Sequence, residues 1–495
     1  MTQQDPRTTD LATSRPIRQR PEPKEIDRKA RFKVPSQLPA KQAPAERIHN
    51  WDEVTFLFDP EIAKIEATRC IQCPAAPCQR ACPVHNDIPG SFWLLEQGDF
   101  AAAADVFRET SALPEMCGRL CPQERLCEGH CVVGKNGPPV AIGKLETFVT
   151  EWQRKHASVD VTPVASASGF SVAVVGTGPA GIGCAERLAR AGHRVVMYEA
   201  WPRPGGLLLY GIPNFKLNKP AVARKFDDLS HLGVEMVTGT RIGEALSLDE
   251  LANEFDAVFL AFGAPESAHL GIPNEEAPGV HEATEFLVRA NLPREALPEQ
   301  MREPLPELRQ VVVIGGGDTS MDCVRSAIRL GAEAVTLIYR RTETEMQGRV
   351  EERKHAREEG VQFEFLTMPV AVLTDESGAV SGLRCRRMQL GEPDESGRAR
   401  PEPIEGSDFD LPANAIVVAI GYNADPSWGD SAPEVRRDRW GRVVVDPESM
   451  RSSQRGVFAG GDNVNGADLV VTALADGQKA AAAIELYLAD PERSW

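Results

Sequence analysis

The sequence predicts an α/β protein in which a small helical, cysteine-rich domain precedes two Rossmann-like dinucleotide-binding domains, the second inserted in the first. Eight of the eleven cysteines fall in one short N-terminal stretch. Two glycine-rich loops, each between a strand pattern and a helix pattern, follow about 140 residues apart. The C-terminal stretch has two apolar strands and a closing helix but no third glycine loop. It is therefore expected to complete the first dinucleotide domain.

The length and composition predict a soluble protein with several domains. Of the 495 residues, 42% are hydrophobic and 26% are charged. A chain of this length is too long for a single hydrophobic core. A net charge of −17 argues against nucleic-acid binding, which needs clustered Lys and Arg. No apolar run suits a secretory signal or a membrane span. We expect a cytoplasmic protein with a protein or small-molecule partner, no nucleic acid and no membrane.

The domain boundaries follow from shifts in composition. The first residues contain seven prolines, an excess of Lys and Arg and little apolar periodicity, which predicts a flexible basic arm. The alternative is an arm that folds against a partner or on the protein's own surface. The apolar spacing between Phe92 and Phe107 predicts a helix interrupted at Gly98. The predicted units are 1–44 for the arm, 45–157 for the helical domain, 168–300 with 413–495 for the first dinucleotide domain, and 306–412 for the inserted one.

The clustered cysteines are spaced as ligands of an inorganic cluster. They are Cys70, Cys73, Cys78, Cys82, Cys117, Cys121, Cys127 and Cys131. A reducing cytosol disfavours disulfides, and the first four lack the longer loop that separates pairs of zinc ligands. The proline after Cys82 is typical of ferredoxin runs, whose last cysteine can bind the other cluster. The pattern favours two [4Fe-4S] clusters, with zinc or mixed sites as the alternative.

The first glycine loop predicts a dinucleotide site. Gly176, Gly178 and Gly181 lie where a tight turn, close approach of a pyrophosphate and close helix packing each exclude a Cβ. The helix that starts there directs its amides at the phosphates. Glu199, at the end of the next strand, is placed to accept hydrogen bonds from ribose hydroxyls. Asp462 follows the strand GVFA, where an acid can bond to the ribityl or phosphate region of a flavin, although Gly-Asp turns are common.

The strand that follows the second glycine loop ends in basic residues instead of an acid. The predicted contacts of the loop are Gly315, Gly316, Gly317 and Asp318. Ser320 replaces the usual third glycine or alanine and still permits close packing. The next strand ends in Arg340 and Arg341, and a guanidinium there could pair with a 2′-phosphate, which favours NADPH over NADH. The alternative is a pair of solvated arginines.

No Ser/His/Asp arrangement or HExxH motif appears in the sequence. We therefore predict no catalytic side chains of the hydrolase kind. Catalysis is expected to be hydride and electron transfer carried by the cofactors.

Six segments, in order from about residue 50 to 485, together resemble the small (beta) subunit of NADPH-dependent glutamate synthase. They are RCIQCPAAPCQRACPVHNDIP, LPEMCGRLCPQERLCEGHC, VVGTGPAGIGCAERLARAGH, PGGLLLYGIPNFKL, VVVIGGGDTSMDC and GVFAGGDNV. The similarity extends to the N-terminal half of dihydropyrimidine dehydrogenase. It also extends to the large subunit of the bifurcating NADH-dependent ferredoxin:NADP oxidoreductase.

The resemblance implies FAD on the first module, NADPH on the inserted one and two [4Fe-4S] clusters. The segment that contains Gly206 would then pass near the flavin ring. Hydride would move from NADPH to the flavin, and electrons would leave singly to the large (alpha) glutamate synthase subunit or another protein acceptor. Glutamate would form there from glutamine and 2-oxoglutarate. The alternatives are a transhydrogenase subunit, a pyrimidine reductase component or a non-catalytic dinucleotide-binding subunit.

The resemblance also implies how the cysteines divide. The first cluster would take Cys70, Cys73, Cys78 and Cys131, and the second would take Cys82, Cys121 and Cys127. The fourth ligand of the second cluster is Glu or Gln in some relatives, for which Glu146 is the nearest match. Otherwise Cys117 completes that cluster, and the sequence leaves both possibilities open.

Overall fold

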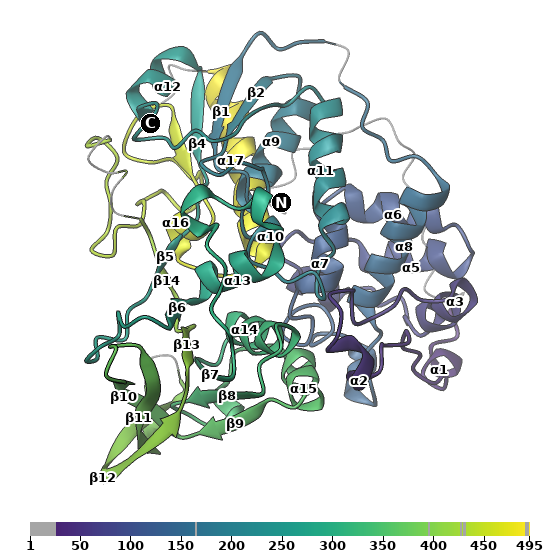
Figure 1. Ribbon diagram of the computed structural model, residues 1–495. Coiled ribbons are helices and arrows are strands. Elements are labelled where there is room, and N and C mark those ends of the chain that lie inside the picture. The colour runs from purple at the N-terminus through teal and green to yellow at the C-terminus, as the bar shows by residue number, and fades with distance from the viewer. Residues whose placement is uncertain (1–25, 164–165, 395–396, 426–427, 429–431, 491–494) are drawn as a thin grey trace.

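A computed structural model describes residues 26–163, 166–394, 397–425, 428, 432–490 and 495. A helical N-terminal unit lies beside two further units, each built on a five-stranded parallel sheet (Figure 1). The predicted fold class is confirmed, including the insertion, because the C-terminal segment returns to the sheet of the first dinucleotide unit. Within the described ranges, no helix is long and apolar enough to cross a membrane.

The N-terminal unit packs short helices around an apolar core. Its helices are α1 (Arg28–Arg31), α2 (Pro44–Arg47), α3 (Pro60–Thr68), α4 (Pro77–Ala81), α5 (Ile88–Glu96), α6 (Phe100–Arg108), α7 (Pro114–Leu120), η2 (Val132–Lys135) and α8 (Ile142–His156). The predicted interruption at Gly98 is confirmed, since that residue has a φ of +84°. Asp99 then caps α6 by accepting a hydrogen bond from the amide of Ala102 at 3.0 Å.

The prediction of a flexible arm is wrong for residues 26–44, which pack on the N-terminal unit, whereas residues 1–25 lie outside the described chain. Arg31 forms an ion pair with Glu96 at 2.7 Å. It also donates to the carbonyl of Cys70 at 2.8 Å. Polar contacts hold this segment in place, so it carries no apolar periodicity by which a sequence pattern could reveal it.

The first dinucleotide unit has the strand order β15-β4-β1-β2-β3. Its elements are β1 (Ser171–Val175), α9 (Pro179–Arg190), β2 (Arg194–Tyr198), α10 (Gly206–Leu209), α11 (Lys219–His231), β3 (Glu235–Val237), α12 (Leu248–Glu254), β4 (Ala257–Leu260), β15 (Val457–Ala459), α16 (Asp462–Asn465) and α17 (Val470–Ala489). Helices α17 and α9 cross closely (Figure 1). A Cβ on Gly477 would lie 1.9 Å from the Ala180 carbonyl oxygen, so this crossing requires glycine.

The second dinucleotide unit has the strand order β6-β13-β7-β8-β9. A three-stranded antiparallel sheet, β10-β11-β12, extends from it. The elements are β6 (Val280–Glu282), α13 (Ala283–Asn291), η3 (Arg294–Ala296), η4 (Glu299–Met301), β7 (Gln310–Ile314), α14 (Asp318–Arg329), β8 (Ala334–Tyr339), η5 (Glu343–Glu345), α15 (Val350–Glu358), β9 (Gln362–Phe365), β10 (Thr367–Thr374), β11 (Val380–Pro393), β12 (Ala399–Pro412) and β13 (Ala415–Val418).

The predicted boundaries of the insertion are wrong at both ends. Strand β6 lies within 168–300 and strand β13 within 413–495, yet β13 pairs with β6 and β7 in the second sheet. A short apolar run such as AIVV fits either parallel sheet equally well, so its pattern cannot assign it. The chain crosses between the units at β5 (Glu266–Ser267) and β14 (Tyr422–Asn423), which pair antiparallel.

A buried charge cluster joins the N-terminal unit to the second dinucleotide unit. We define this interdomain charge cluster as Arg47, Arg325, Arg329, Glu352 and Glu359. The fully buried Glu359 carboxylate contacts Arg47 at 2.7 Å, Arg325 at 2.8 Å and Arg329 at 2.8 Å. Burial alone would raise the pKa of Glu359, but hydrogen bonds and charges from Arg325 and Arg329 lower this pKa to about 2.

The first dinucleotide unit contacts the same cluster through Phe215. The guanidinium carbons of Arg325 and Arg329 lie 4.3 Å and 4.1 Å from the centre of its ring. On the N-terminal unit, Trp51 lies 5.9 Å from Phe215 between ring centroids. All three units therefore meet at one desolvated point, where cation–π contacts reinforce the ion pairs.

Glu359→Gln should lower the free energy of unfolding by about 3 kcal/mol, because it removes the carboxylate that three buried guanidinium groups share. The folded-state pKa of Glu359 is below its ordinary value of 4.5. Its stabilisation is therefore present above about pH 4.5 and lost as the pH falls toward about 2. The variant should show less acid destabilisation in this window. Urea unfolding followed by circular dichroism at pH 7 and pH 4 measures both effects.

Glu358→Gln is the matched control. Glu358 pairs with Arg47 at 2.9 Å, but a third of its side chain is exposed. The expected cost is below about 1 kcal/mol. Equal losses in the two variants would contradict the special role of Glu359.

Candidate functional site

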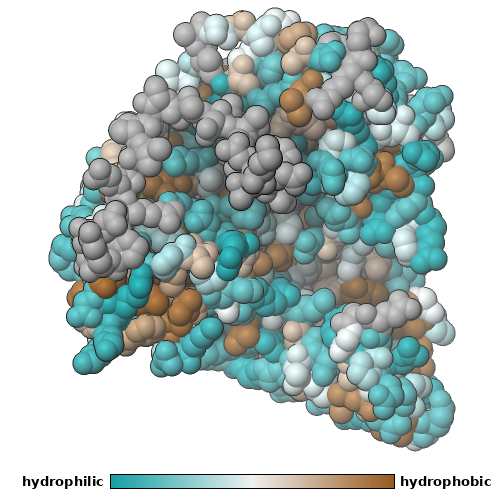
Figure 2. Space-filling view, turned by 180° about the vertical axis from the view of Figure 1, so that it is seen from behind, coloured by the Kyte–Doolittle hydropathy of each residue, from teal (hydrophilic) through white to brown (hydrophobic). Residues whose placement is uncertain are grey.

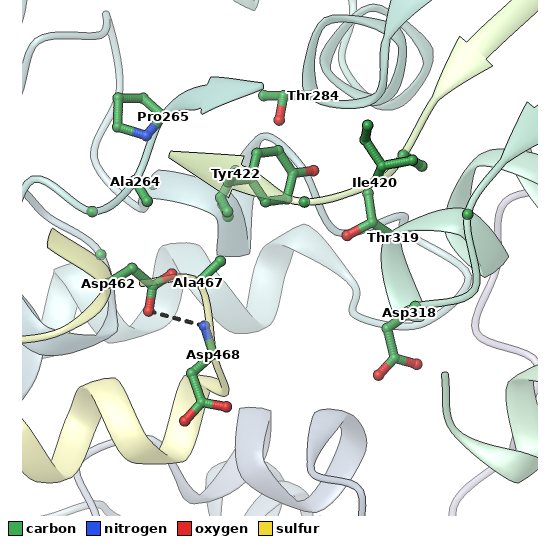
Figure 3. Close-up of a pocket in the computed structure, with 18 of the residues that line it drawn as sticks. Ala264, Pro265, Thr284, Asp318, Thr319, Ile420, Tyr422, Asp462, Ala467 and Asp468 are labelled. Atoms are coloured by element: carbon green, nitrogen blue, oxygen red, sulfur yellow. Dashed lines mark hydrogen bonds between the residues drawn. The ribbon is translucent and has the colours of Figure 1, made fainter. Parts of the chain in front are cut away.

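A single cavity of about 1270 Å³ lies between the two dinucleotide units and is lined by both glycine loops. In Figure 3, Asp462 and Asp468 from the first unit lie across the cavity from Asp318 and Thr319 of the second. Tyr422, from the chain crossing, lies between the two groups. The predicted dinucleotide sites are thus halves of one continuous space, large enough for extended ligands.

The first glycine loop joins β1 to α9. Gly176 has a φ of +105°, and a Cβ there would lie 2.3 Å from the Ala261 carbonyl oxygen. Gly178 is the N-cap residue of α9, and both glycines line the cavity. Gly181 does not line it, since a Cβ there would lie 2.1 Å from the Gly176 carbonyl oxygen. Two glycines therefore open the backbone to a ligand, and the third permits helix packing.

Glu199 lines the cavity at the end of β2. Its carboxylate accepts hydrogen bonds from the Thr177 hydroxyl and, at 2.9 Å, from the Trp201 amide. Burial raises the pKa of Glu199, and the bond from Thr177 acts in the opposite direction. The Thr177 hydroxyl also accepts from the amide of Gly205 at 2.8 Å. Thr177 was missed in the sequence because it occupies a variable position of the motif.

Gly206 and Asp462 also line the cavity, on the first-unit side. The Asp462 carboxylate accepts from the Asp468 amide at 3.4 Å, as drawn in Figure 3. Burial raises the pKa of Asp462 to about 6. A hydrogen-bonding ligand at this point would meet an acid that is readily protonated.

The second glycine loop joins β7 to α14, and all four predicted contacts line the cavity: Gly315, Gly316, Gly317 and Asp318. Gly315 has a φ of +146°, and a Cβ there would lie 2.2 Å from the Ala419 carbonyl oxygen. Ser320 is fully buried and donates to that carbonyl at 3.3 Å. The serine thus tolerates the close packing that the motif requires.

Arg340 and Arg341 both line the cavity, but their side chains differ. Arg340 is exposed and makes no hydrogen bond or ion pair with another residue in the part of the chain that the structure describes. Arg341 is buried, pairs with Asp394 at 2.6 Å and donates to the Ala399 carbonyl at 2.8 Å. The two predicted arginines are therefore not equivalent, because only Arg340 is available to an incoming anion.

Lys216 and Asp322 connect the two units at the cavity wall and were missed in the sequence. The Lys216 ammonium from the first unit lies 2.8 Å from the Asp322 carboxylate on α14. Burial raises the pKa of Asp322 to about 6 although Lys216 acts to lower it. The segment PNFKL has the pattern of an apolar loop with one solvated lysine, so no feature of the sequence indicated that Lys216 is buried.

The first set of cysteines gathers as the resemblance implies. Cys70, Cys73, Cys78 and Cys131 line one small apolar pocket. Cys131 is close enough to the other three for their charges to interact. Burial raises the pKa of Cys78 to about 12, so its thiol is neutral at pH 7 until a metal replaces the proton.

The second set surrounds Glu146 on α8. Burial raises the pKa of Cys82 and Cys127. A hydrogen bond between Cys117 and Cys121 raises the pKa of Cys121 and opposes the rise that burial causes in Cys117. The nearby Glu146 carboxylate adds to the rise in all four thiols. Glu146 is itself buried and accepts from the Asn86 amide at 3.2 Å. The structure therefore brings together all of the predicted ligands of this set, including both candidates for its fourth position.

Among the described residues, no three His, Cys, Asp or Glu side chains converge as ligands of a single ion. A [4Fe-4S] cluster is held by thiolates on different irons, and the first set of cysteines offers four thiols around one pocket.

Two protein families match the chain. Residues 47–158 match dihydropyrimidine dehydrogenase domain II, 4Fe-4S cluster. Residues 170–477 match pyridine nucleotide-disulphide oxidoreductase. These matches coincide with the helical unit and with the two dinucleotide units.

Curated relatives confirm the resemblance. The glutamate synthase [NADPH] small chain of Halomonas elongata is 40% identical over 92% of this chain and 97% of that protein. The one from Escherichia coli is 40% identical over 88% of this chain and 93% of that protein. The putative oxidoreductase AegA of Escherichia coli is 43% identical over 90% of this chain and 69% of that protein.

A solved structure with this fold is Mycobacterium tuberculosis FprA in complex with NADPH. It has a TM-score of 0.56 and 20% identity, and the match covers 65% of this chain and 85% of that one. At that identity the likeness shows the fold alone.

Lys216→Met and Asp322→Asn should each lower the thermal midpoint of unfolding, because each variant leaves the other member of this buried ion pair without its partner. The double variant should be more stable than the sum of the single losses predicts, since it removes both members of the pair. Thermal unfolding of all four proteins gives the coupling energy. Strictly additive losses would show that the contact between Lys216 and Asp322 does not link the units energetically.

Proposed function

Because the chain belongs to the pyridine nucleotide-disulphide oxidoreductase family, we propose that it is an iron-sulfur flavoprotein that oxidises NADPH for a glutamate synthase. Electrons would pass to the large (alpha) subunit, where glutamate forms from glutamine and 2-oxoglutarate. The observation that carries the proposal is the single cavity lined by both glycine loops, in a chain that also gathers two sets of thiols. A reducing cytoplasm suits these thiols.

We assign the first-unit side of the cavity to FAD. Its proposed contacts are Gly176, Gly178, Glu199, Gly206 and Asp462, while Gly181 permits the close packing of α9 on the loop. The N-terminus of α9 directs free amides toward a pyrophosphate, and Glu199 is oriented by Thr177 to accept from ribose hydroxyls. When bound, the flavin supplies the conversion of a two-electron hydride into single electrons.

We assign the second-unit side to NADPH. Its proposed contacts are Gly315, Gly316, Gly317, Asp318 and Arg340, with Arg341 in a supporting position. Gly317 is the N-cap residue of α14, whose free amides suit the pyrophosphate. Arg340 would meet the 2′-phosphate directly, whereas Arg341 would act through the hairpin that it holds. The chain would thus orient the nicotinamide toward the flavin inside one cavity.

We assign two [4Fe-4S] clusters to the N-terminal unit. The first would be held by Cys70, Cys73, Cys78 and Cys131, and the second by Cys82, Cys121, Cys127 and Glu146. Glu146 is a candidate because it is buried on α8 within interaction range of these cysteines, as it is of Cys117. Cys117 instead hydrogen-bonds to Ser111 and Cys121, as a spare thiol would.

Glu146→Ala should change the EPR spectrum of one of two clusters in anaerobically reduced protein, since that cluster loses a ligand. Cys117→Ser is the matched control and should leave both signals in place. EPR with iron quantitation measures both. A normal spectrum in Glu146→Ala and a lost signal in Cys117→Ser would return the fourth position to Cys117.

NADPH should bleach the flavin absorbance of the purified protein under argon. Anaerobic pull-down from the native extract should recover a large amidotransferase, with NADPH oxidation that depends on glutamine and 2-oxoglutarate. Bleaching without that activity, with recovery of a small ferredoxin-reductase-like flavoprotein, would move the function to transhydrogenation. Bound flavin that NADPH cannot reduce would contradict an electron-entry role.

A further inference from the structure

We propose that the hairpin formed by β11 and β12 completes the subsite for the adenosine 2′-phosphate of NADPH, with Arg398 as a specificity-determining residue beside Arg340. This inference rests on the proposed use of NADPH by the second unit. It adds a structural element that lies outside the glycine-loop motif and its strand-end arginines.

Arg341 fixes the hairpin to the end of strand β8. Its guanidinium pairs with Asp394 at 2.6 Å and donates to the Ala399 carbonyl at 2.8 Å. Its backbone carbonyl accepts from the Leu366 amide at 3.1 Å. The Leu366 carbonyl in turn accepts from the Met388 amide at 2.7 Å. The hairpin is therefore tied to the strand end that carries the 2′-phosphate determinant of a Rossmann unit.

This attachment brings two arginines that are distant in sequence to one rim. Arg340 precedes Arg341, and Arg398 precedes Ala399, so the bond from Arg341 to Ala399 joins the two segments that carry these arginines. Arg340 and Arg398 both line the cavity. Two guanidinium groups on such a rim suit a phosphate dianion.

The hairpin also presents an apolar surface next to these charges. Met388 pairs with Pro403, and Leu390 pairs with Pro401, across the antiparallel register. Met388, Pro401 and Pro403 line the cavity, and Met368 from β10 joins them. An apolar surface beside a basic rim suits a flat purine that carries an anionic group on its ribose.

The outer shape of the molecule agrees with this position. The sheet β10-β11-β12 projects at the lower left of Figure 1. With the molecule turned by 180°, it forms the protrusion at the lower right of Figure 2, below a recess in the surface. A ligand entering between the units would therefore pass the hairpin.

The test is competition by 2′,5′-ADP and by 5′-AMP for a fluorescent nucleotide bound to the holoprotein. These probes differ by the 2′-phosphate and need no turnover. Arg398→Ala should weaken 2′,5′-ADP binding by about 10- to 100-fold and 5′-AMP binding by less than about 3-fold, because one charge-assisted contact is lost. Arg340→Ala should show the same selectivity.

Arg400→Ala is the matched control. Arg400 lies on β12, is exposed and falls on the face opposite Pro401 and Pro403. It should leave both affinities unchanged. Selective loss in Arg340→Ala with wild-type binding in Arg398→Ala would overturn the role of the hairpin and leave the proposed function standing. No 2′-phosphate preference in the unaltered protein, together with flavin that NADPH does not reduce, would overturn the proposed function itself.

Discussion

The interdomain charge cluster is the constraint on which the rest of the structure depends. Glu359 is fully buried against guanidinium groups from two units, and two of these groups lie over the ring of Phe215 from the third unit. Buried ion pairs give little net stability relative to an apolar core, but they are costly to break and they require a specific geometry. The cluster therefore acts mainly by fixing how the units are placed. The large cavity lies between the two dinucleotide units, so its shape depends on how these units are placed.

Few covalent and sheet contacts oppose relative movement of those two units. The chain crosses between them at β5 and β14, a pair of two-residue strands. Lys216 and Asp322 add one buried ion pair at the cavity wall. An apolar contact could slide over some distance, whereas a desolvated ion pair loses most of its attraction when the partners separate. Hydride transfer needs reacting atoms in close contact, so this pair lies where positional accuracy has the most effect on the proposed reaction.

The sequence predicted the features that have local signatures and missed those that depend on distant partners. Both glycine loops were identified because the backbone conformation at Gly176 and Gly315 excludes other residues. The cysteine sets were identified because cluster ligands have characteristic spacing. The packing of residues 26–44 was missed because hydrogen bonds from arginine side chains to backbone carbonyls leave no apolar periodicity in the sequence. The sequence suggested that Arg341 binds a ligand, because its true partner, Asp394, lies 53 residues further along the chain and has no local signature.

Hydrogen bonds from one arginine join the second dinucleotide unit to the proposed cluster site. Arg349, which precedes α15 of the second dinucleotide unit, donates to the Arg119 carbonyl at 2.7 Å and to Gln123 at 2.9 Å. Both acceptors flank Cys121, and a hydrogen bond with Cys117 and burial raise the pKa of that thiol well above its ordinary value against the opposing charge of Arg349. Rotation of the second unit would pull directly on the turn that holds a proposed cluster ligand. Arg349 therefore ties the second dinucleotide unit to the turn on which a ligand of the second proposed cluster lies.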